Sequence, residues 1–299
     1  MSHPRPPAAT ERPNPAARGL DRRSAADLVR LMHREDARAL RAVRRVLPRV
    51  AAAVRLLERV LDRGGRCVLA GAGTSGRLAA MEAAECPPTF SAPPGQFIAL
   101  MAGGPAALQR AVEGAEDDPS AGARQARAAR IGPGDLVVGV SASGATPFVR
   151  GVLGEARRRG AATVLIACVP RPPLASLARL VIPLAVGPEV VAGSTRLKAG
   201  TATKLVLNML TTAAMARRGK VHDNLMVDVR PTNAKLRARA VRIVASIARV
   251  DPAMARRHLA RAGWEVKTAV LCAARGLAPA TARDLLRRTR GRIRPALPR

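Results

Sequence analysis

The stretch that decides the fold is Cys67–Phe90, which reads CVLAGAGTSGRLAAMEAAECPPTF. It contains a short apolar run, a glycine-rich turn, an alanine-rich helix, and then Glu85 beside a cysteine and two prolines. Glycines allow the backbone to turn tightly and approach a ligand. Thr74 and Ser75 add hydroxyl and amide donors at a helix N-terminus, where an anion is favoured. The stretch predicts a strand, a phosphate-binding turn and a helix.

Two other interpretations of this turn stay open from its residues alone. Gly71, Gly73 and Gly76 have the GxGxxG spacing of a dinucleotide site. However, no acidic residue closes the next apolar run near Gly103, where a ribose partner would lie. The turn could also be purely structural.

The same alternation of apolar runs and helices continues along the chain. We expect strands at 66–71, 96–103, 135–143, 162–169 and 180–186, separated by helices at 76–84, 105–113, 121–130, 147–158 and 200–218. Near-continuous apolar strands between helices predict an α/β fold, a doubly wound parallel five-stranded sheet covered on both faces. Ligands bind such sheets beyond the carboxyl ends of the strands.

The flanking segments are predicted to be helical or irregular. Residues 1–22 are rich in Pro and Arg and should be extended or disordered. Two helices should follow, with Ser24 as the N-cap and a break near Pro48. Beyond residue 220, Asp251-Pro252 and Ala278-Pro279 mark helix starts in a small helical module. The expected parts are an N-terminal arm (1–56), an α/β domain (57–220) and a connecting helix with a C-terminal helical module (221–299).

Two further segments offer ligand-binding groups. The turn SASGATP (141–147) brings Ser141, Ser143 and Thr146 to another strand-to-helix junction, and neither hydroxyl-rich turn is a Walker A loop. A small monophosphate, bound through hydroxyls and amides without a metal, fits the two turns best. The run GPEVVAGSTRLKAGTATK (187–204) places Glu189, Ser194 and Lys198 before a long helix, which also fits a capped helix start with solvated charges.

Composition limits the classes of partner. The net charge of +30 invites a nucleic-acid interpretation, but only five of the 51 basic residues are lysine and aromatic residues make up 1% of the chain. Stacking platforms for single strands are therefore lacking, and we expect no dedicated nucleic-acid recognition. No apolar run is long enough to span a membrane and no secretory signal is present, so we expect a cytoplasmic protein without a membrane partner. The scattered cysteines predict reduced, buried thiols.

Taken together, the motifs resemble a known family. The segments GAGTSGRLAAMEAAECPPTF, MAGG with AVEGAEDD, SASGATPF, GPEVVAGSTRLKAGTATKLVLNML, and GKVHDNLMVDV with TNAKL are similar to those of the N-acetylmuramic acid 6-phosphate etherases. These are bacterial cell-wall-recycling enzymes built on a sugar isomerase (SIS) domain. The resemblance runs from Ala25 to Gly291.

The resemblance implies a carbon–oxygen lyase that acts on a small-molecule sugar phosphate. It would cleave the D-lactyl ether of N-acetylmuramic acid 6-phosphate to N-acetylglucosamine 6-phosphate and D-lactate, as a homodimer without a metal or redox cofactor. The family's two acid/base glutamates match Glu85 in ECPPT and Glu116 in EGAED. The hydroxyls of Thr74, Ser75, Ser141, Ser143 and Thr146 would hold the 6-phosphate.

The implied chemistry explains the need for two carboxyl groups. In the open-chain sugar the C1 aldehyde acidifies the C2 proton, a base removes that proton, and the lactyl oxygen leaves C3 with help from an acid. Water then adds to the unsaturated aldehyde. One carboxyl must be ionised and one protonated, or one group must change role. We assign proton abstraction and protonation of the leaving lactate to Glu85 and the second acid/base role to Glu116, with Glu113 as the rival to Glu116.

The chain also departs from the family pattern. Ala145 stands where arginine is common, Phe148 where tyrosine is common and His222 where an aromatic is common, and VPRPPL (169–174) replaces an Asn-Pro turn. These changes predict altered contacts to the substrate. The alternative function is a non-catalytic sugar-phosphate-binding regulator on the same scaffold, similar to the glucokinase regulatory protein. Such a protein could dispense with the carboxylates, so the presence of Glu85 and Glu116 favours the enzyme.

Overall fold

The computed structural model describes residues 9–298 and contains two compact units. The first unit comprises the described residues up to Ala83 together with Gly95–Leu210. The second comprises Ala84–Pro94 and the residues from Thr211 onward. Two helices, α2 (Gly73–Phe90) and α5 (Lys198–Met215), contribute residues to both.

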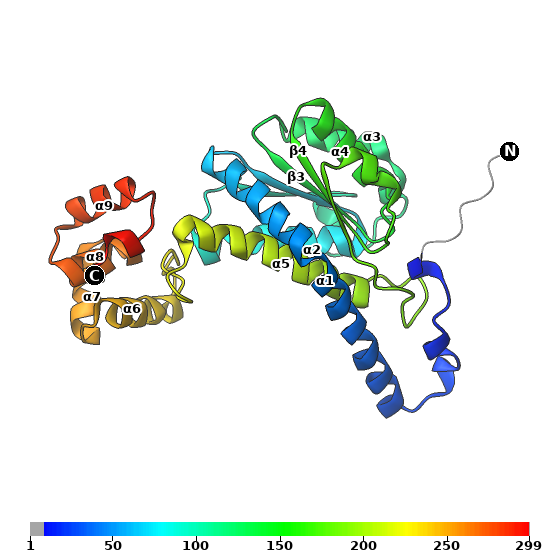
Figure 1. Ribbon diagram of the computed structural model, residues 1–299, viewed down its shortest axis with the longest axis horizontal. Helices are drawn as coiled ribbons and strands as arrows, with labels where there is room; N and C mark the ends of the chain where they lie inside the picture. The colour runs from blue at the N-terminus through cyan, green and yellow to red at the C-terminus, as the bar shows by residue number, and fades with distance from the viewer. Residues whose placement is uncertain (1–8, 299) are drawn as a thin grey trace. The chain divides into compact units, whose positions relative to one another are not determined.

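The first unit is built on a five-stranded parallel sheet with the strand order β2-β1-β3-β4-β5 (Figure 1). Cys67 of β1 pairs with Phe97 on one side and with Leu136 on the other. All five predicted strands are confirmed, each shorter than its apolar run. They are β1 (Cys67–Gly71), β2 (Phe97–Met101), β3 (Leu136–Ser141), β4 (Ala162–Ala167) and β5 (Leu180–Pro183).

Helices cover both faces of this sheet (Figure 1). On one face, α3 (Pro119–Ala128) packs against α4 (Pro147–Arg158), and Phe148 and Leu153 of α4 enter a core with alternate residues of the strands. On the other face, α1 (Ala25–Asp62) contacts β1, β3 and β5. Because successive side chains of a strand point to opposite faces, each strand supplies both cores. The predicted doubly wound α/β fold is confirmed.

The second unit is a helical module with its own core. Its helices pack Val244, Leu259 and Val270 together, and these side chains are fully buried. No strand is assigned among its described residues, as the sequence predicts. The helices are α6 (Ala234–Ala248), α7 (Pro252–Arg261), α8 (Val266–Arg275) and α9 (Pro279–Arg288).

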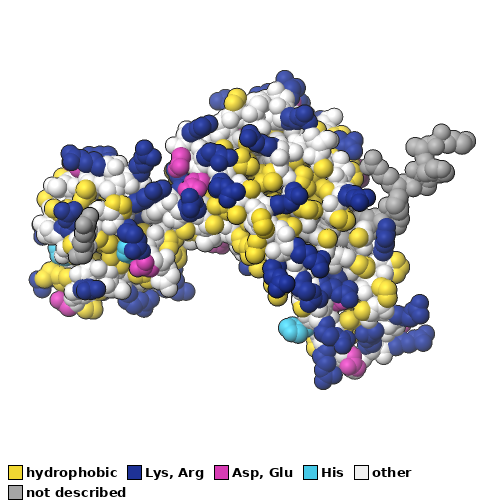
Figure 2. All heavy atoms as spheres, in the orientation of Figure 1, with side chains coloured by type: hydrophobic (Ala, Val, Ile, Leu, Met, Phe, Trp, Pro, Cys, Tyr) yellow, Lys and Arg dark blue, Asp and Glu magenta, His cyan; other side chains and the backbone are white. Residues whose placement is uncertain are grey.

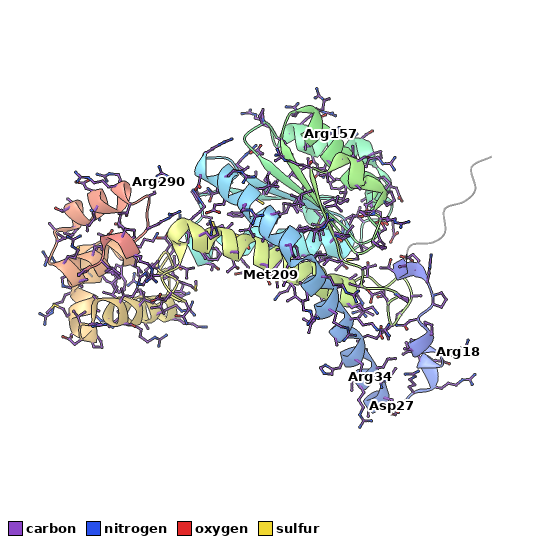
Figure 3. All side chains as sticks on the ribbon, in the orientation of Figure 1. Arg18, Asp27, Arg34, Arg157, Met209 and Arg290 are labelled. Carbon is purple, nitrogen blue, oxygen red and sulfur yellow. The ribbon has the colours of Figure 1, made fainter. Side chains whose placement is uncertain are left out.

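The predicted helix starts are confirmed. The Ser24 hydroxyl accepts a hydrogen bond from the Asp27 amide at 3.2 Å and caps α1, where Figure 3 labels Asp27. The Asp251 carboxylate accepts from the Met254 amide at 2.8 Å and caps α7. α9 follows Ala278. Capping oxygens satisfy amides that have no partner inside the helix.

The predicted break near Pro48 is wrong, because α1 is one helix of 38 residues. Proline removes one helical hydrogen bond, which usually bends or ends a helix. Pro48 lies on the exposed side of α1, whereas Val43, Val46 and Val50 form a buried stripe that continues past it. Packing of this stripe on the sheet therefore keeps the helix continuous.

Two other helix predictions need correction. Residues 105–113 contain only a short 3₁₀ turn, Pro105–Leu108, and the glycines on either side of the segment, Gly103, Gly104 and Gly114, have positive φ angles that a helix does not adopt. Conversely, α2 does not end at residue 84 but continues through both prolines to Phe90. Glu85 therefore lies within a helix and not in a turn.

The N-terminal segment is more ordered than its composition suggests. Of the predicted extended or disordered stretch 1–22, residues 1–8 lie outside the described residues. For 9–22 the prediction is wrong, since this part forms three 3₁₀ turns, Ala9–Glu11, Pro15–Ala17 and Leu20–Arg22. Buried Asn14 accepts from the Ala16 amide at 3.0 Å and caps the second turn.

Other expectations from composition can be compared with the structure. The four cysteines are buried thiols that form no disulfide with one another, as predicted. Within residues 9–298, no helix combines the length and apolar character that crossing a membrane requires. On the face drawn in Figure 2, Lys and Arg side chains are scattered widely, with hydrophobic atoms exposed between them.

Candidate active site

The first hydroxyl-rich turn joins β1 to α2. A Cβ on Gly71 would lie 2.7 Å from the Gly76 nitrogen, and a Cβ on Gly76 would lie 2.7 Å from the Gly71 oxygen. Only glycine permits this approach of the strand end to the helix start. Thr74 and Ser75 are half-buried in the first turn of α2. Amides in a first helical turn have no partner within the helix, so this turn can receive an anion.

The second hydroxyl-rich turn joins β3 to α4 and brings its three predicted residues together. The Ser141 Oγ lies 2.7 Å from the Thr146 Oγ1 and 3.4 Å from the Ser143 Oγ. The Ser143 Oγ also accepts from the Ala145 amide at 3.2 Å. Gly144 has a φ of +67°, and a Cβ there would lie 2.3 Å from the Pro172 Cβ. The turn is thus a compact cluster of hydroxyls held by its own bonds.

The two turns are neighbours because of the strand order. β1 and β3 pair directly, and the chain leaves β1 toward β2 on the other side. The point at which the strand order reverses is where open α/β sheets bind ligands, beyond the carboxyl ends of the strands. The hydroxyls predicted to bind phosphate therefore flank this switch point.

Glu116 lines a cavity that opens beside the first turn. The cavity has a volume of about 300 Å³, and its lining includes Gly73, Arg77, Glu113 and Glu116. Glu116 is exposed and lies on a short 3₁₀ turn, Ala115–Asp117, which follows β2. Glu113 lines the same cavity, so it stays an alternative to Glu116 for the second acid/base role.

Glu85 is exposed in the last part of α2 and belongs to the second unit, whereas Glu116 belongs to the first. One turn earlier on α2, Glu82 is buried and accepts a hydrogen bond from the Asn208 Nδ2 of α5 at 2.5 Å. α2 therefore carries a buried glutamate bonded to the protein and an exposed one only three residues later.

The third predicted segment, residues 187–204, forms hydrogen bonds and an ion pair at the start of α5. Glu189 is fully buried, and its carboxylate accepts from the Lys198 amide at 3.2 Å and the Ala199 amide at 2.9 Å. The Lys198 ammonium forms an ion pair with buried Glu35. Ser194 is half-buried in the intervening loop. The segment lies beside the first turn, because a Cβ on Gly200 would lie 3.6 Å from the Thr74 Cγ2.

Electrostatics distinguish the two buried glutamates. Burial raises the pKa of Glu189, and its amide hydrogen bonds only partly offset this. Burial also opposes ionisation of Glu35, but hydrogen bonds from Lys198 and Asn14, together with the Lys198 charge, lower the pKa of Glu35. Glu35 is therefore the ionised partner of Lys198.

Some residues of this region were not predicted from the sequence. Arg77 donates to the carbonyl oxygens of Leu108 at 3.2 Å and Arg110 at 3.3 Å, which ties the start of α2 to the wall of the Glu116 cavity. Asn14 donates to the Glu35 carboxylate at 2.9 Å and to the Pro188 carbonyl at 3.3 Å. Arg77 directly follows Gly76, the last glycine of the turn, and this position could have drawn attention to it. No local pattern identifies Asn14.

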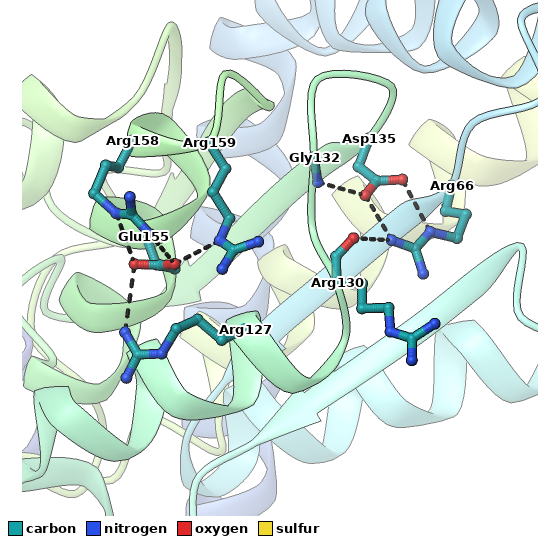
Figure 4. Close-up of polar contacts among 8 residues, drawn as sticks. All are labelled: Arg66, Arg127, Arg130, Gly132, Asp135, Glu155, Arg158 and Arg159. Atoms are coloured by element: carbon teal, nitrogen blue, oxygen red, sulfur yellow. Dashed lines mark hydrogen bonds and ion pairs between the residues drawn. The ribbon is translucent and has the colours of Figure 1, made fainter.

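Two further buried carboxylates are held in ion-pair clusters (Figure 4). The Asp135 carboxylate accepts two hydrogen bonds from the Arg66 guanidinium, at 3.0 and 2.7 Å, and one from the Gly132 amide at 3.0 Å. Glu155 is surrounded by Arg127, Arg158 and Arg159. Among residues 9–298, no group of three or more His, Cys, Asp or Glu side chains has a metal-binding arrangement.

Comparisons with known proteins relate this geometry to a family. The chain matches the family models described as "Glucokinase regulatory protein N-terminal SIS domain", over residues 49–157, and "SIS domain", over residues 115–213. It is also 48% identical over 288 residues to the N-acetylmuramic acid 6-phosphate etherase of Edwardsiella ictaluri (strain 93-146), covering 96% of each chain. The chain belongs to the N-acetylmuramic acid 6-phosphate etherase family. The etherase of Serratia proteamaculans (strain 568) is 47% identical over 290 residues, covering 97% of this chain and 98% of that one.

Solved structures share the fold of this etherase-family chain. A phosphoheptose isomerase from Francisella tularensis has a TM-score of 0.53 at 16% identity, covering 65% of this chain and 100% of that one. A putative phosphosugar isomerase from Bacteroides fragilis NCTC 9343 has a TM-score of 0.51 at 20% identity, covering 67% of this chain and 95% of that one. The family resemblance and the SIS-type fold inferred from the sequence are confirmed.

Within this etherase-family chain, the predicted site residues fall into three groups. The hydroxyls of Ser141, Ser143 and Thr146 form one cluster, and Thr74 and Ser75 lie at the adjacent turn. Glu189 and Lys198 are engaged in buried protein contacts at the start of α5, beside that turn. The last group is the exposed carboxylates: Glu116 lines a cavity of the first unit, and Glu85 belongs to the second. The roles of all of these residues stay predictions.

Proposed function

We propose that the chain is a carbon–oxygen lyase that converts N-acetylmuramic acid 6-phosphate and water to N-acetylglucosamine 6-phosphate and D-lactate. The observation that carries the proposal is the family membership over 96% of the chain. The hydroxyl cluster at the switch point supports it, because a phosphate there would receive hydrogen bonds from two turns at once. A cytoplasmic location also stays a prediction.

The proposed mechanism is an elimination followed by addition of water. Glu85 removes the C2 proton of the open-chain sugar, and the C1 aldehyde delocalises the negative charge that forms at C2. The C3–O bond then breaks, and Glu85 gives the proton to the lactyl oxygen, which leaves as the alcohol of D-lactate. Water adds at C3 with Glu116 as the acid/base group, and C2 regains a proton. Both carboxyl groups are exposed, so each can reach a substrate.

We also propose that the chain acts as a homodimer through α1. Val29, Leu40 and Leu47 are 62%, 59% and 43% exposed. They are separated by 11 and 7 residues, which are close to whole turns of a helix, so they form one apolar stripe. Exposed apolar stripes of this kind mark association surfaces. Met209 of α5, labelled in Figure 3, is also exposed, at 37%.

The proposal is tested by D-lactate release from N-acetylmuramic acid 6-phosphate. We expect the natural chain to release D-lactate, and Glu85→Gln or Glu116→Gln to lower kcat by about 10²–10⁴-fold, the usual effect of losing a general acid or base. Glu113→Gln is the matched control, since Glu113 lines the same cavity as Glu116. Loss of activity in Glu113→Gln with activity kept in Glu116→Gln would reassign the second role.

Isotopic labelling tests the bond that breaks. In H₂¹⁸O, cleavage at C3 places the label in N-acetylglucosamine 6-phosphate and leaves the lactate hydroxyl unlabelled. Label in the lactate hydroxyl would contradict the elimination. Binding of the sugar phosphate without any D-lactate release would favour the regulatory alternative, to which the partial match with the glucokinase regulatory protein model points.

A further inference from the structure

The second unit contains a cavity that the etherase proposal does not use. Its volume is about 630 Å³, within the range of small-molecule sites. It is bordered by the segment 227–231, by the start of α8 and by the end of α9. Its lining includes the side chains of Lys220, Asp228 and Lys267.

Two lysines share one carboxylate at this cavity. The Asp228 Oδ2 lies 2.8 Å from the Lys220 Nζ and 2.8 Å from the Lys267 Nζ. The Ser91 hydroxyl donates to the Asp228 backbone carbonyl and holds this residue in place. The side chain of Lys267 is only 9% exposed and that of Lys220 is 21% exposed. One positive charge is therefore left uncompensated in a largely buried cluster.

The remaining charges of the lining add a second positive charge. Arg283 is paired with Glu265 at 2.8 Å, and Arg287 is paired with Asp284. Arg230 also lines the cavity, and no ion pair joins it to a carboxylate within residues 9–298. Once the Arg283–Glu265 and Arg287–Asp284 pairs are set aside, an excess of two positive charges is left at the cavity, which a dianion would balance.

Burial makes this arrangement costly without an anion. Burial lowers the pKa of Lys267, and the positive charge of nearby Lys220 lowers that pKa further. The charge and hydrogen bond of Asp228 act in the opposite direction and raise it. A bound dianion would supply the missing negative charge and accept hydrogen bonds from both ammonium groups. Each ammonium has three donors, of which the Asp228 contact uses one.

The choice of lysine at these positions is informative in this chain. Only five of the 51 basic residues are lysine, and two of those five lie at this cavity. Lysine presents a compact point charge, whereas the planar guanidinium of arginine is larger and has donors in a fixed fork. Two compact ammonium groups can converge on one oxygen and still leave space for a ligand.

We propose that this cavity binds a phosphate group through Lys220 and Lys267, either as inorganic phosphate or as the monoester of an amino-sugar phosphate. Phosphate matches the site better than a carboxylate does, because its second negative charge balances the excess in the lining. The site stands independently of the etherase activity.

The test uses the full-length protein and lysine acetylation followed residue by residue with mass spectrometry. Inorganic phosphate at ten times its dissociation constant should slow acetylation of Lys220 about tenfold, since about nine-tenths of the sites are then occupied. Exposed Lys235 of α6 and Lys204 of α5 are internal controls and should not change. Equal slowing at all lysines would overturn the proposal.

Three ligands distinguish the two possible sources of the phosphate group. Protection of Lys220 from acetylation by inorganic phosphate identifies free phosphate as the ligand. Protection only by N-acetylglucosamine 6-phosphate identifies the monoester. Protection by D-lactate as strong as that by phosphate would overturn the choice of phosphate. Because the readout is protection of Lys220, it is unaffected by whether the chain releases D-lactate.

Equilibrium dialysis with radiolabelled inorganic phosphate provides a second measurement. Lys220→Met should bind one phosphate fewer per chain than the natural protein, and Lys235→Met should bind the same number. Lys267→Met should also lose this phosphate; Lys220→Met keeps the test valid if the more buried substitution prevents folding. An unchanged stoichiometry in a folded Lys220→Met protein would refute the site.

Discussion

At the scale of single residues, the carboxylates of this chain differ in what they are bonded to. Glu155, Asp135, Glu35 and Glu189 are buried and accept hydrogen bonds from arginine, lysine or backbone amides. Exposed Glu116 lines a cavity. A carboxylate already bonded to the protein cannot exchange protons with a substrate without losing those bonds, so exposure favours the reactive role.

Glu155 provides a prediction about pH. Hydrogen bonds from Arg158 and then Arg159 lower the pKa of Glu155 to about 2, although burial opposes this. Its contribution to stability is therefore fully present above its unfolded pKa, near 4.5, and is lost as the pH falls toward 2. We expect Glu155→Gln to lower the thermal midpoint at pH 7 and to lower it much less at pH 3.

The control for this prediction is Asp21→Asn. Asp21 is 82% exposed and its contact with Arg22 is 4.0 Å long, so neutralising it should leave the thermal midpoint nearly unchanged at both values of pH. A difference between the natural protein and Glu155→Gln that does not shrink toward pH 3 would contradict the ion-pair explanation.

At the scale of elements, Pro48 lies in the interior of α1 on its exposed side. Alanine would restore one helical hydrogen bond and remove the clash of the proline ring with the preceding turn. We expect Pro48→Ala to raise the free energy of unfolding by about 1–3 kcal/mol in urea denaturation. Pro147→Ala, at the first position of α4 where proline is favourable, should give no such gain. A destabilised Pro48→Ala protein would mean that α1 packs better with proline than with alanine at this position.

A second element-scale prediction concerns Asn14, which joins the N-terminal segment to Glu35 and to the loop before α5. Asn14→Ala should lower the free energy of unfolding by about 1–3 kcal/mol, because a hydrogen bond to a buried carboxylate is lost. Amide hydrogen exchange over residues 187–199 should become faster. Asn233→Ala, which removes the cap of α6, is the control and should leave this exchange unchanged. Unchanged exchange in Asn14→Ala would show that the loop is held by other contacts.

The same elements show what a sequence can and cannot reveal. The glycine and hydroxyl turns were predictable because all of their determinants lie within a few residues of one another. The continuous α1 was not, because packing of its buried valines outweighs the local effect of Pro48. The Glu35–Lys198 pair joins residues 163 positions apart, and no local pattern links them. Buried polar networks of this kind depend on the tertiary fold.

At the scale of the whole molecule, charge and apolar surface favour different partners. The net charge is +30, but Lys and Arg side chains are scattered over the visible face and do not form one stripe (Figure 2). Scattered charge attracts polyanions weakly and loses that attraction as salt screens it. The apolar stripe of Val29, Leu40 and Leu47 on α1 is insensitive to such screening, and it favours a second copy of the chain.

This stripe gives the last prediction. Sedimentation velocity should show the natural chain at about twice its monomer mass of 31.3 kDa. Leu40→Glu should shift it to the monomer, because the interface would lose the apolar contact of Leu40 and a charged carboxylate would have to give up its water there. Arg41→Glu is the matched control: its side chain is exposed on the same helix but points about 100° away from Leu40, so the dimer should persist. A Leu40→Glu protein that stays dimeric would place the interface elsewhere. A natural chain that sediments as a monomer would remove the dimer itself, and the apolar stripe of α1 would then need another partner.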